Sequence, residues 1–181
     1  SAQFSEIDLN LDGIKDIVVF ARSGNKLSPY INFNGDFIFA PEYRDKFPNI
    51  ESWMILEDYN CDGLNDIFTY SNAGIAVYLN TSTTTLSFNL ASSQLVNTSS
   101  GLGIYVSPMD LPAFSDVDYD GDIDILTFEI SGGFVHYFKN QSIENYGNCD
   151  YLEYDHAHVC WGDFYEGLNT YTLDCMNCMC P

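Results

Sequence analysis

Acidic side chains recur at a fixed spacing in three stretches of the chain, residues 8–16, 58–66 and 116–124. Each stretch reads Asp-x-[Asp/Asn]-x-Asp-Gly-x-x-Asp, so oxygen-bearing side chains stand at positions 1, 3, 5 and 9 around a glycine at position 6. Carboxylate and amide oxygens are the ligands that hard cations take, and Ca²⁺ is the expected occupant. The glycine permits a sharp bend at positive φ, and the backbone carbonyl at position 7 would complete the coordination.

This spacing predicts about three structural calcium ions, one for each stretch. The expected ligands are Asp8, Asn10, Asp12, Ile14 and Asp16 in the first, Asp58, Asn60, Asp62, Leu64 and Asp66 in the second, and Asp116, Asp118, Asp120, Asp122 and Asp124 in the third. One such motif would be a weak signal, because acidic turns with glycine are common on surfaces, but three copies with the same ninth residue are specific. EF-hands are excluded, because position 12 is Val19, Thr69 or Thr127 rather than Glu and strand patterns follow each motif.

The repetition continues beyond the acidic motifs. After each ninth-position Asp come an Ile, then an aromatic residue, then a glycine at the same distances: Ile17, Phe20 and Gly24; Ile67, Tyr70 and Gly74; Ile125, Phe128 and Gly132. The repeated unit is therefore predicted to be strand, acidic loop, strand, Gly turn, strand, polar turn and a fourth strand, for example at residues 37–40 and 86–90.

The first Asp recurs after 50 and then 58 residues, close to the roughly 40–50 residues of a four-stranded propeller blade. The predicted fold is all-β, with about three β-propeller blades. A parallel β-solenoid fits less well, because its calcium repeats are about nine residues long.

At this point the chain resembles a known family. Asp-x-[Asp/Asn]-x-Asp-Gly-x-x-Asp-Ile, followed by a hydrophobic strand, a Gly turn and an aromatic-rich strand that ends in Asn, is similar to the FG-GAP or VCBS repeat over about residues 4–145. The resemblance implies a β-propeller with Ca²⁺ at positions 1, 3, 5, 7 and 9. The literal Phe-Gly and Gly-Ala-Pro signatures are not clear, which favours the secreted bacterial type over integrin heads. By extension, the resemblance suggests a cargo of the type 9 secretion system of Bacteroidota.

Closed propellers use four to eight blades, and 181 residues supply about three at this period. We therefore expect the chain to be a portion of a larger secreted protein. Two segments are expected: blades with three calcium loops over residues 1–147, and a disulfide-rich, irregular or short-stranded segment over residues 148–181.

The charge balance narrows the possible partners. Six Lys and Arg stand against 26 Asp and Glu, which gives a formal net charge of −20. Nucleic acid is not expected as a partner, because phosphates need a basic footprint. No run of eighteen apolar residues is present, so no membrane-spanning helix is expected.

The cysteines indicate an oxidising compartment, and hence a secreted or cell-surface location. The disulfide candidates are Cys61, Cys149, Cys160, Cys175, Cys178 and Cys180, and six cysteines allow fifteen pairings. One alternative is a zinc site made of His156, His158, Cys160, Cys175 and Cys178. A redox role for the Cys-x-x-Cys pair is less favoured, since no thioredoxin-like βαβ pattern surrounds it.

These observations favour a non-catalytic, calcium-stabilised module for adhesion or for binding an extracellular protein, a glycan or another subunit of a cell-envelope assembly. Exposed loops such as residues 81–85 and 97–103, or the cysteine-rich segment, are the expected contact surfaces. The alternative is a hydrolase or lyase that acts on polysaccharide and carries a propeller scaffold. That alternative requires two carboxylates, not used for calcium, about 5–10 Å apart in a cleft.

Overall fold

The computed structural model describes residues 1–71, 74–130 and 132–173. These residues form two compact units. The first comprises residues 1–58 and 62–93, and the second comprises residues 59–61 together with the chain from residue 94.

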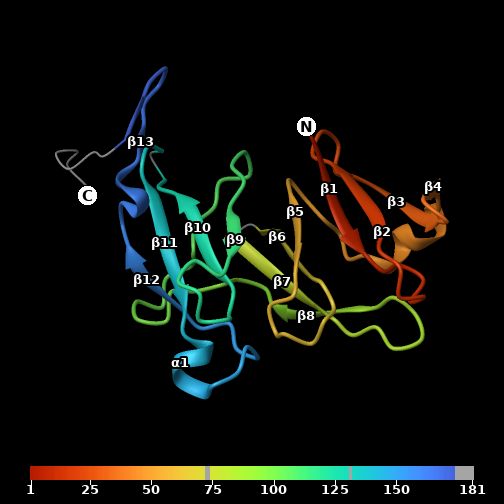
Figure 1. The fold of residues 1–181 in the computed structure, drawn as a ribbon. Helices are drawn as coiled ribbons and strands as arrows, with labels where there is room; N and C mark the ends of the chain where they lie inside the picture. The colour runs from red at the N-terminus through yellow and green to blue at the C-terminus, as the bar shows by residue number, and fades with distance from the viewer. Residues whose placement is uncertain (72–73, 131, 174–181) are drawn as a thin grey trace. The chain divides into compact units, whose positions relative to one another are not determined.

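The first unit contains two four-stranded antiparallel sheets, in each of which the strands lie side by side in chain order (Figure 1). The strands of the first sheet are β1 (Ala2–Ile7), β2 (Asp16–Ala21), β3 (Lys26–Phe33) and β4 (Asp36–Phe39). Those of the second are β5 (Met54–Glu57), β6 (Asp66–Ser71), β7 (Gly74–Asn80) and β8 (Phe88–Ser92). A short 3₁₀ helix, η1 (Pro41–Lys46), follows β4.

One hydrophobic core serves both sheets of this unit. The alternation of β2 buries Val18 and Phe20 on one face, as a half-buried strand requires, and these side chains belong to the same cluster as Met54 and Ile67 of the second sheet. Gln3 adds a polar link, because its amide nitrogen donates to the carbonyl of Met54 at 3.0 Å and its amide oxygen accepts from the same residue's N–H at 3.1 Å.

The second unit contains a third four-stranded antiparallel sheet and a two-stranded ribbon. Its sheet has the order β9 (Ala113–Ser115), β10 (Asp124–Phe128), β11 (Val135–Asn140) and β12 (Tyr154–His158). The remaining elements are α1 (Ser142–Tyr146), the 3₁₀ helix η2 (Trp161–Asp163), β13 (Tyr165–Glu166) and β14 (Tyr171–Thr172). Tyr154 and Ile125 are fully buried in this unit.

The described chain is mostly β, as the sequence predicted. The fourth strands expected at residues 37–40 and 86–90 are found at Asp36–Phe39 and Phe88–Ser92. The three turn glycines have positive φ, as expected for such turns: 88° at Gly24, 127° at Gly74 and 75° at Gly132. Within the predicted cysteine-rich segment, Tyr154–His158 forms an edge strand that pairs with β11. The assembly of these sheets into a propeller stays a prediction.

In the part of the chain that the structure describes, no helix is long and apolar enough to cross a membrane.

Candidate functional site

The three acidic motifs form loops with one shared geometry. Loop 1 (residues 8–16), loop 2 (58–66) and loop 3 (116–124) each connect the first two strands of a sheet. In every loop the Asp at position 1 accepts the N–H groups of positions 5 and 6, one with each carboxylate oxygen. The N···O distances are 3.1 and 2.7 Å in loop 1, 3.1 and 2.8 Å in loop 2, and 3.1 and 3.1 Å in loop 3.

The backbone bends at two positions of each loop. The glycines at position 6 have φ of 84°, 88° and 107°, which confirms the sequence-based expectation for Gly13, Gly63 and Gly121. The residues at position 4 also have positive φ, 60° at Leu11, 60° at Cys61 and 65° at Tyr119. Sequence reasoning missed this second bend, because Leu, Cys and Tyr carry no preference for the left-handed region.

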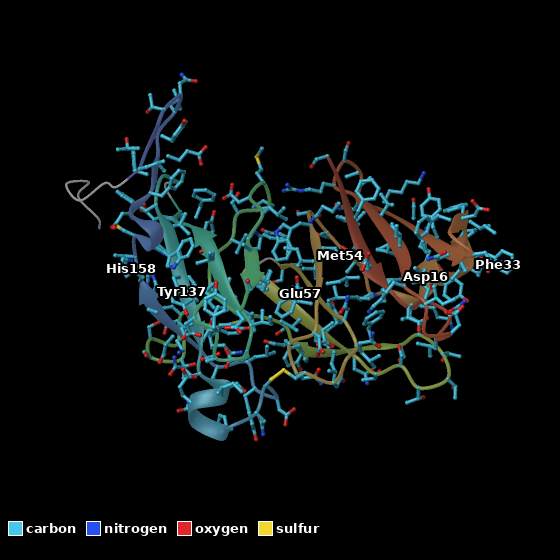
Figure 2. All side chains as sticks on the ribbon, viewed as in Figure 1. Asp16, Phe33, Met54, Glu57, Tyr137 and His158 are labelled. Atoms are coloured by element: carbon cyan, nitrogen blue, oxygen red, sulfur yellow. A yellow bond between two sulfur atoms is a disulfide. The ribbon has the colours of Figure 1, made fainter. Side chains whose placement is uncertain are left out.

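The ninth-position Asp of each loop is fully buried and accepts backbone hydrogen bonds. Asp16, labelled in Figure 2, accepts the N–H of Leu9 at 2.8 Å and that of Asn32, near the end of β3, at 2.7 Å. Asp124 likewise accepts from Val117 at 2.9 Å and from Asn140 at 2.8 Å. Each of these carboxylates therefore fastens its loop to the third strand of its sheet.

The second sheet repeats this contact, because Asp66 accepts the N–H of Asn80 at 2.7 Å. In all three sheets the strand-ending Asn then accepts a backbone N–H two or three residues further on with its own side-chain oxygen. This local turn ends the strand. The predicted role of the ninth-position Asp as a calcium ligand remains a prediction beside this observed structural role.

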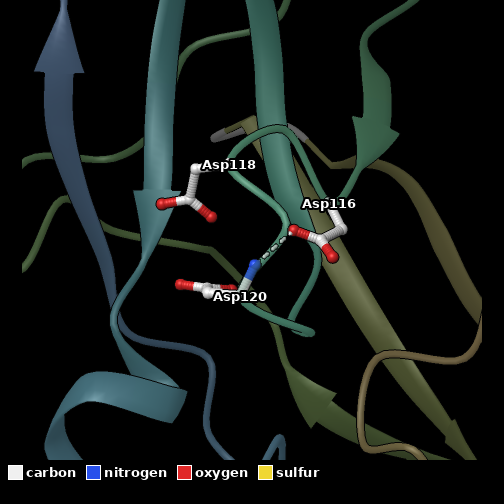
Figure 3. A group of neighbouring side chains, drawn as sticks. All are labelled: Asp116, Asp118 and Asp120. Atoms are coloured by element: carbon white, nitrogen blue, oxygen red, sulfur yellow. Dashed lines mark hydrogen bonds between the residues drawn. The ribbon is translucent and has the colours of Figure 1, made fainter.

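Among the described residues, three acidic side chains lie close enough to hold one metal ion only in and around loop 3, and not in loops 1 and 2. Carboxylate oxygens of Asp116, Asp118 and Asp120 lie within 4.8 Å of one another and surround the tip of the loop (Figure 3). A second group, Asp120, Asp122 and Glu144, meets the same distance limit and shares Asp120 with the first. The all-oxygen donor set suits a hard divalent cation.

A lysine lies among these carboxylates. The Nζ of Lys139, on β11, contacts Asp118 and Glu144 and lies 3.1 Å from Asp120 Oδ2. Hydrogen bonds to Asp118 and Glu144 raise the pKa of Lys139, so it stays an ammonium ion. Burial raises the pKa of Asp122 to about 6, because its charged form is desolvated.

Loops 1 and 2 carry less negative charge, because position 3 is Asn and position 7 is apolar. Asn10 accepts the N–H of Asp12 at 3.1 Å and donates to Asp12 Oδ2 at 2.9 Å. Asn60 belongs to the 59–61 segment of the second unit. The predicted carbonyl ligands Ile14 and Leu64 donate their N–H groups to the position-5 Asp, each at 2.8 Å. Coordination by their carbonyls remains a prediction.

The structure selects one disulfide that the sequence could not, Cys61 to Cys149, which are 88 residues apart; its sulfur atoms are joined by a yellow bond in Figure 2. Cys160 is also disulfide-bonded. A disulfide sulfur offers no thiolate, so Cys160 cannot serve as the zinc ligand that the alternative interpretation required. Cys175, Cys178 and Cys180 lie outside the described residues.

A hollow of about 610 Å³ opens in the second unit beside two histidines. The rings of His136 and His156 lie 4.6 Å apart, and His156 stacks on Phe138 at 4.6 Å. Burial lowers the pKa of both histidines, and for His136 the charge of His156 acts in the same direction. Part of loop 97–103, expected to be a contact surface, lines the hollow at Asn97, Ser100, Leu102 and Gly103.

A scan against protein-family models and a search of curated proteins matched nothing to this chain.

Proposed function

We propose that the chain is a non-catalytic, calcium-stabilised module that binds an extracellular protein or a glycan, as part of a larger secreted or cell-surface protein. The observation that carries this proposal is the recurrence of one hydrogen-bond pattern in loops 1, 2 and 3. Each loop sits between the first two strands of a four-stranded antiparallel sheet. That sheet order is also the one expected for propeller blades of the FG-GAP or VCBS kind.

Calcium accounts for the composition of the loops better than a plain turn does. A turn needs one side-chain acceptor and a glycine, whereas loop 3 brings carboxylate oxygens of Asp116, Asp118 and Asp120 within 4.8 Å of one another, and loops 1 and 2 repeat the Asp at positions 1, 5 and 9. Like charges at such distances repel one another, and a divalent cation removes that repulsion. Asp116, Asp118 and Asp120 would hold the ion in loop 3, and Asp8, Asn10 and Asp12 are the equivalent residues of loop 1. The ion contributes charge neutralisation and loop rigidity.

The hollow of the second unit is the proposed contact surface. Aromatic side chains line it at Tyr105, Phe128 and Phe138, and Asn97 and Glu129 supply polar groups. A concave site with an apolar lining and a few polar groups is the usual form of a ligand site. Tyr105 is 44% exposed, so its ring is accessible to a partner.

The calcium part of the proposal is tested by unfolding the 181-residue chain in excess Ca²⁺ and in EDTA, with bound metal counted by elemental analysis. At free calcium about 1,000-fold above Kd, each site adds about 4 kcal/mol to the free energy of unfolding. Asp62→Ala should lose one ion, whereas Asp36→Ala, an exposed Asp on β4, should lose none. A folded parent chain that binds no calcium and unfolds identically in EDTA would refute the proposal.

The binding part is tested with an array of soluble polysaccharides and extracellular-matrix proteins in calcium buffer. Tyr105→Ala should weaken binding at least tenfold. Tyr171→Ala, which removes a 73% exposed Tyr that does not line this hollow, should bind like the parent. Cleavage of a polysaccharide by the parent chain would instead favour the hydrolase or lyase alternative.

A further inference from the structure

Loop 3 differs from loops 1 and 2 by a second acidic group beside the expected cation site. Asp122 stands at position 7, where the other loops have Ile14 and Leu64, and Glu144 comes from α1. Carboxylate oxygens of Asp120, Asp122 and Glu144 lie within 4.8 Å of one another. Loops 1 and 2 carry apolar residues at position 7 and so lack a counterpart of Asp122.

The surroundings of the Asp122 side chain indicate a bound ligand independently of this acidic group. Its side chain is 0% exposed. Its Oδ2 accepts the N–H of Ile143 at 3.0 Å, but its Oδ1 is buried without a hydrogen-bond partner. A buried carboxylate oxygen without a partner is costly and rare in folded proteins, and a bound cation would supply the missing partner.

Lys139 does not fill this role. Its ion pairs in the described chain are with Asp118, Asp120 and Glu144, and not with Asp122. The five Asp of loop 3 and Glu144 together carry six carboxylates against this single ammonium. One divalent ion in loop 3 would leave three net negative charges, which is enough to attract a second.

We propose that loop 3 binds a second hard divalent cation, Ca²⁺, through Asp120, Asp122 and Glu144, with Asp120 bridging the two ions. The Lys139 ammonium competes with this ion for Asp120 and Glu144 and leaves them when the ion binds. Because Glu144 lies on α1, the ion fastens this helix to loop 3. The site adds one ion to the three of the proposed function and depends on them only through the shared Asp120.

The test is equilibrium dialysis of the full chain against calcium alone, with bound metal counted. Asp122→Asn and Glu144→Gln should each bind one ion fewer than the parent. Asp150→Asn, an equal charge change at an exposed position of the same unit, should match the parent. Lys139→Met should tighten binding of one ion at least tenfold, since the competing ammonium is gone, and Glu144→Gln in the same chain should abolish that gain.

The outcomes separate this site from the proposed function. If Asp62→Ala loses an ion while Glu144→Gln and Asp122→Asn do not, the repeated loops bind calcium and the second site is refuted. If no variant and no parent chain binds calcium, both proposals fail. Should Asp122→Asn not fold, Glu144→Gln decides the result, because the Glu144 side chain is 35% exposed and its substitution leaves the core intact.

Discussion

Asp16→Ala tests whether the ninth-position Asp acts as a structural acceptor independent of calcium. The substitution leaves the N–H groups of Leu9 and Asn32 without the carboxylate that accepts them at 2.8 and 2.7 Å. Hydrogen bonds to a charged group contribute about 1.5–3 kcal/mol each. Asp16 is 0% exposed, so the two N–H groups are buried, and the free energy of unfolding should fall by about 3–6 kcal/mol.

The assay is urea unfolding followed by tryptophan fluorescence. Of the two tryptophans, Trp53 is fully buried in the first unit and Trp161 is 38% exposed in the second. Measured in both excess Ca²⁺ and EDTA, the loss for Asp16→Ala should be nearly the same. Asp12→Ala should behave differently, with a loss of about 4 kcal/mol at saturating calcium and little loss in EDTA. Asp36→Ala is the matched control and should unfold like the parent in both buffers.

Two results would refute this reasoning. If Asp16→Ala destabilises the chain only in the presence of calcium, and to the same extent as Asp12→Ala, then Asp16 acts through the ion and not through its backbone hydrogen bonds. If the loss stays below about 1 kcal/mol in both buffers, the two bonds contribute no more than a surface contact does.

Three further predictions concern other parts of the molecule. Gly63→Ala should lower the free energy of unfolding by about 1–2 kcal/mol in calorimetry, because φ is 88° there and an L-residue is strained, although a Cβ would meet no atom within 4 Å. The pKa of His136 and of His156 is lower in the folded chain than in the unfolded chain. The free energy of unfolding should therefore be greatest above about pH 6.5 and fall as the pH drops further. His136→Phe should reduce this pH dependence, as measured by urea titrations at pH 5 and 7.5. Cys149→Ser should lower the free energy of unfolding by about 2–4 kcal/mol, since the disulfide closes a loop of 88 residues, and a reducing agent should then have a smaller effect than on the parent.

The local structure of the loops and strands could be predicted from the sequence. Which aspartates accept backbone hydrogen bonds, and which are left to bind a cation, could not. The alternation of apolar residues in β2 predicts which side chains are buried, and the glycine at position 6 predicts the positive φ of the loop. Both features can be seen directly in the sequence. Asp12 and Asp16 are the same residue type, four positions apart. Asp16 is fully buried and accepts backbone N–H groups, whereas Asp12 is the expected cation ligand, and the sequence alone does not show this difference in burial. The burial of Asp122 was missed for the same reason, because a position-7 residue was expected to act through its carbonyl.

Contacts between segments far apart in the chain could not be predicted from the sequence either. Cys61 pairs with Cys149 across 88 residues, and no spacing rule selects that pair from fifteen. The short helix α1 has no side-chain cap at its N-terminus and no long amphipathic pattern, so nothing in the sequence marked it. Its placement of Glu144 beside loop 3 depends on tertiary structure.

The disulfide between Cys61 and Cys149 also affects whether proteolysis separates the chain into two pieces. A single cut anywhere between these two residues, for instance in the exposed stretch around Ser99 and Ser100, divides the backbone but leaves both pieces covalently joined. A nicked molecule would therefore run as one band on a gel without reductant and as two bands with it. After such a cut, the N-terminal sheets would stay covalently attached to the rest of the chain.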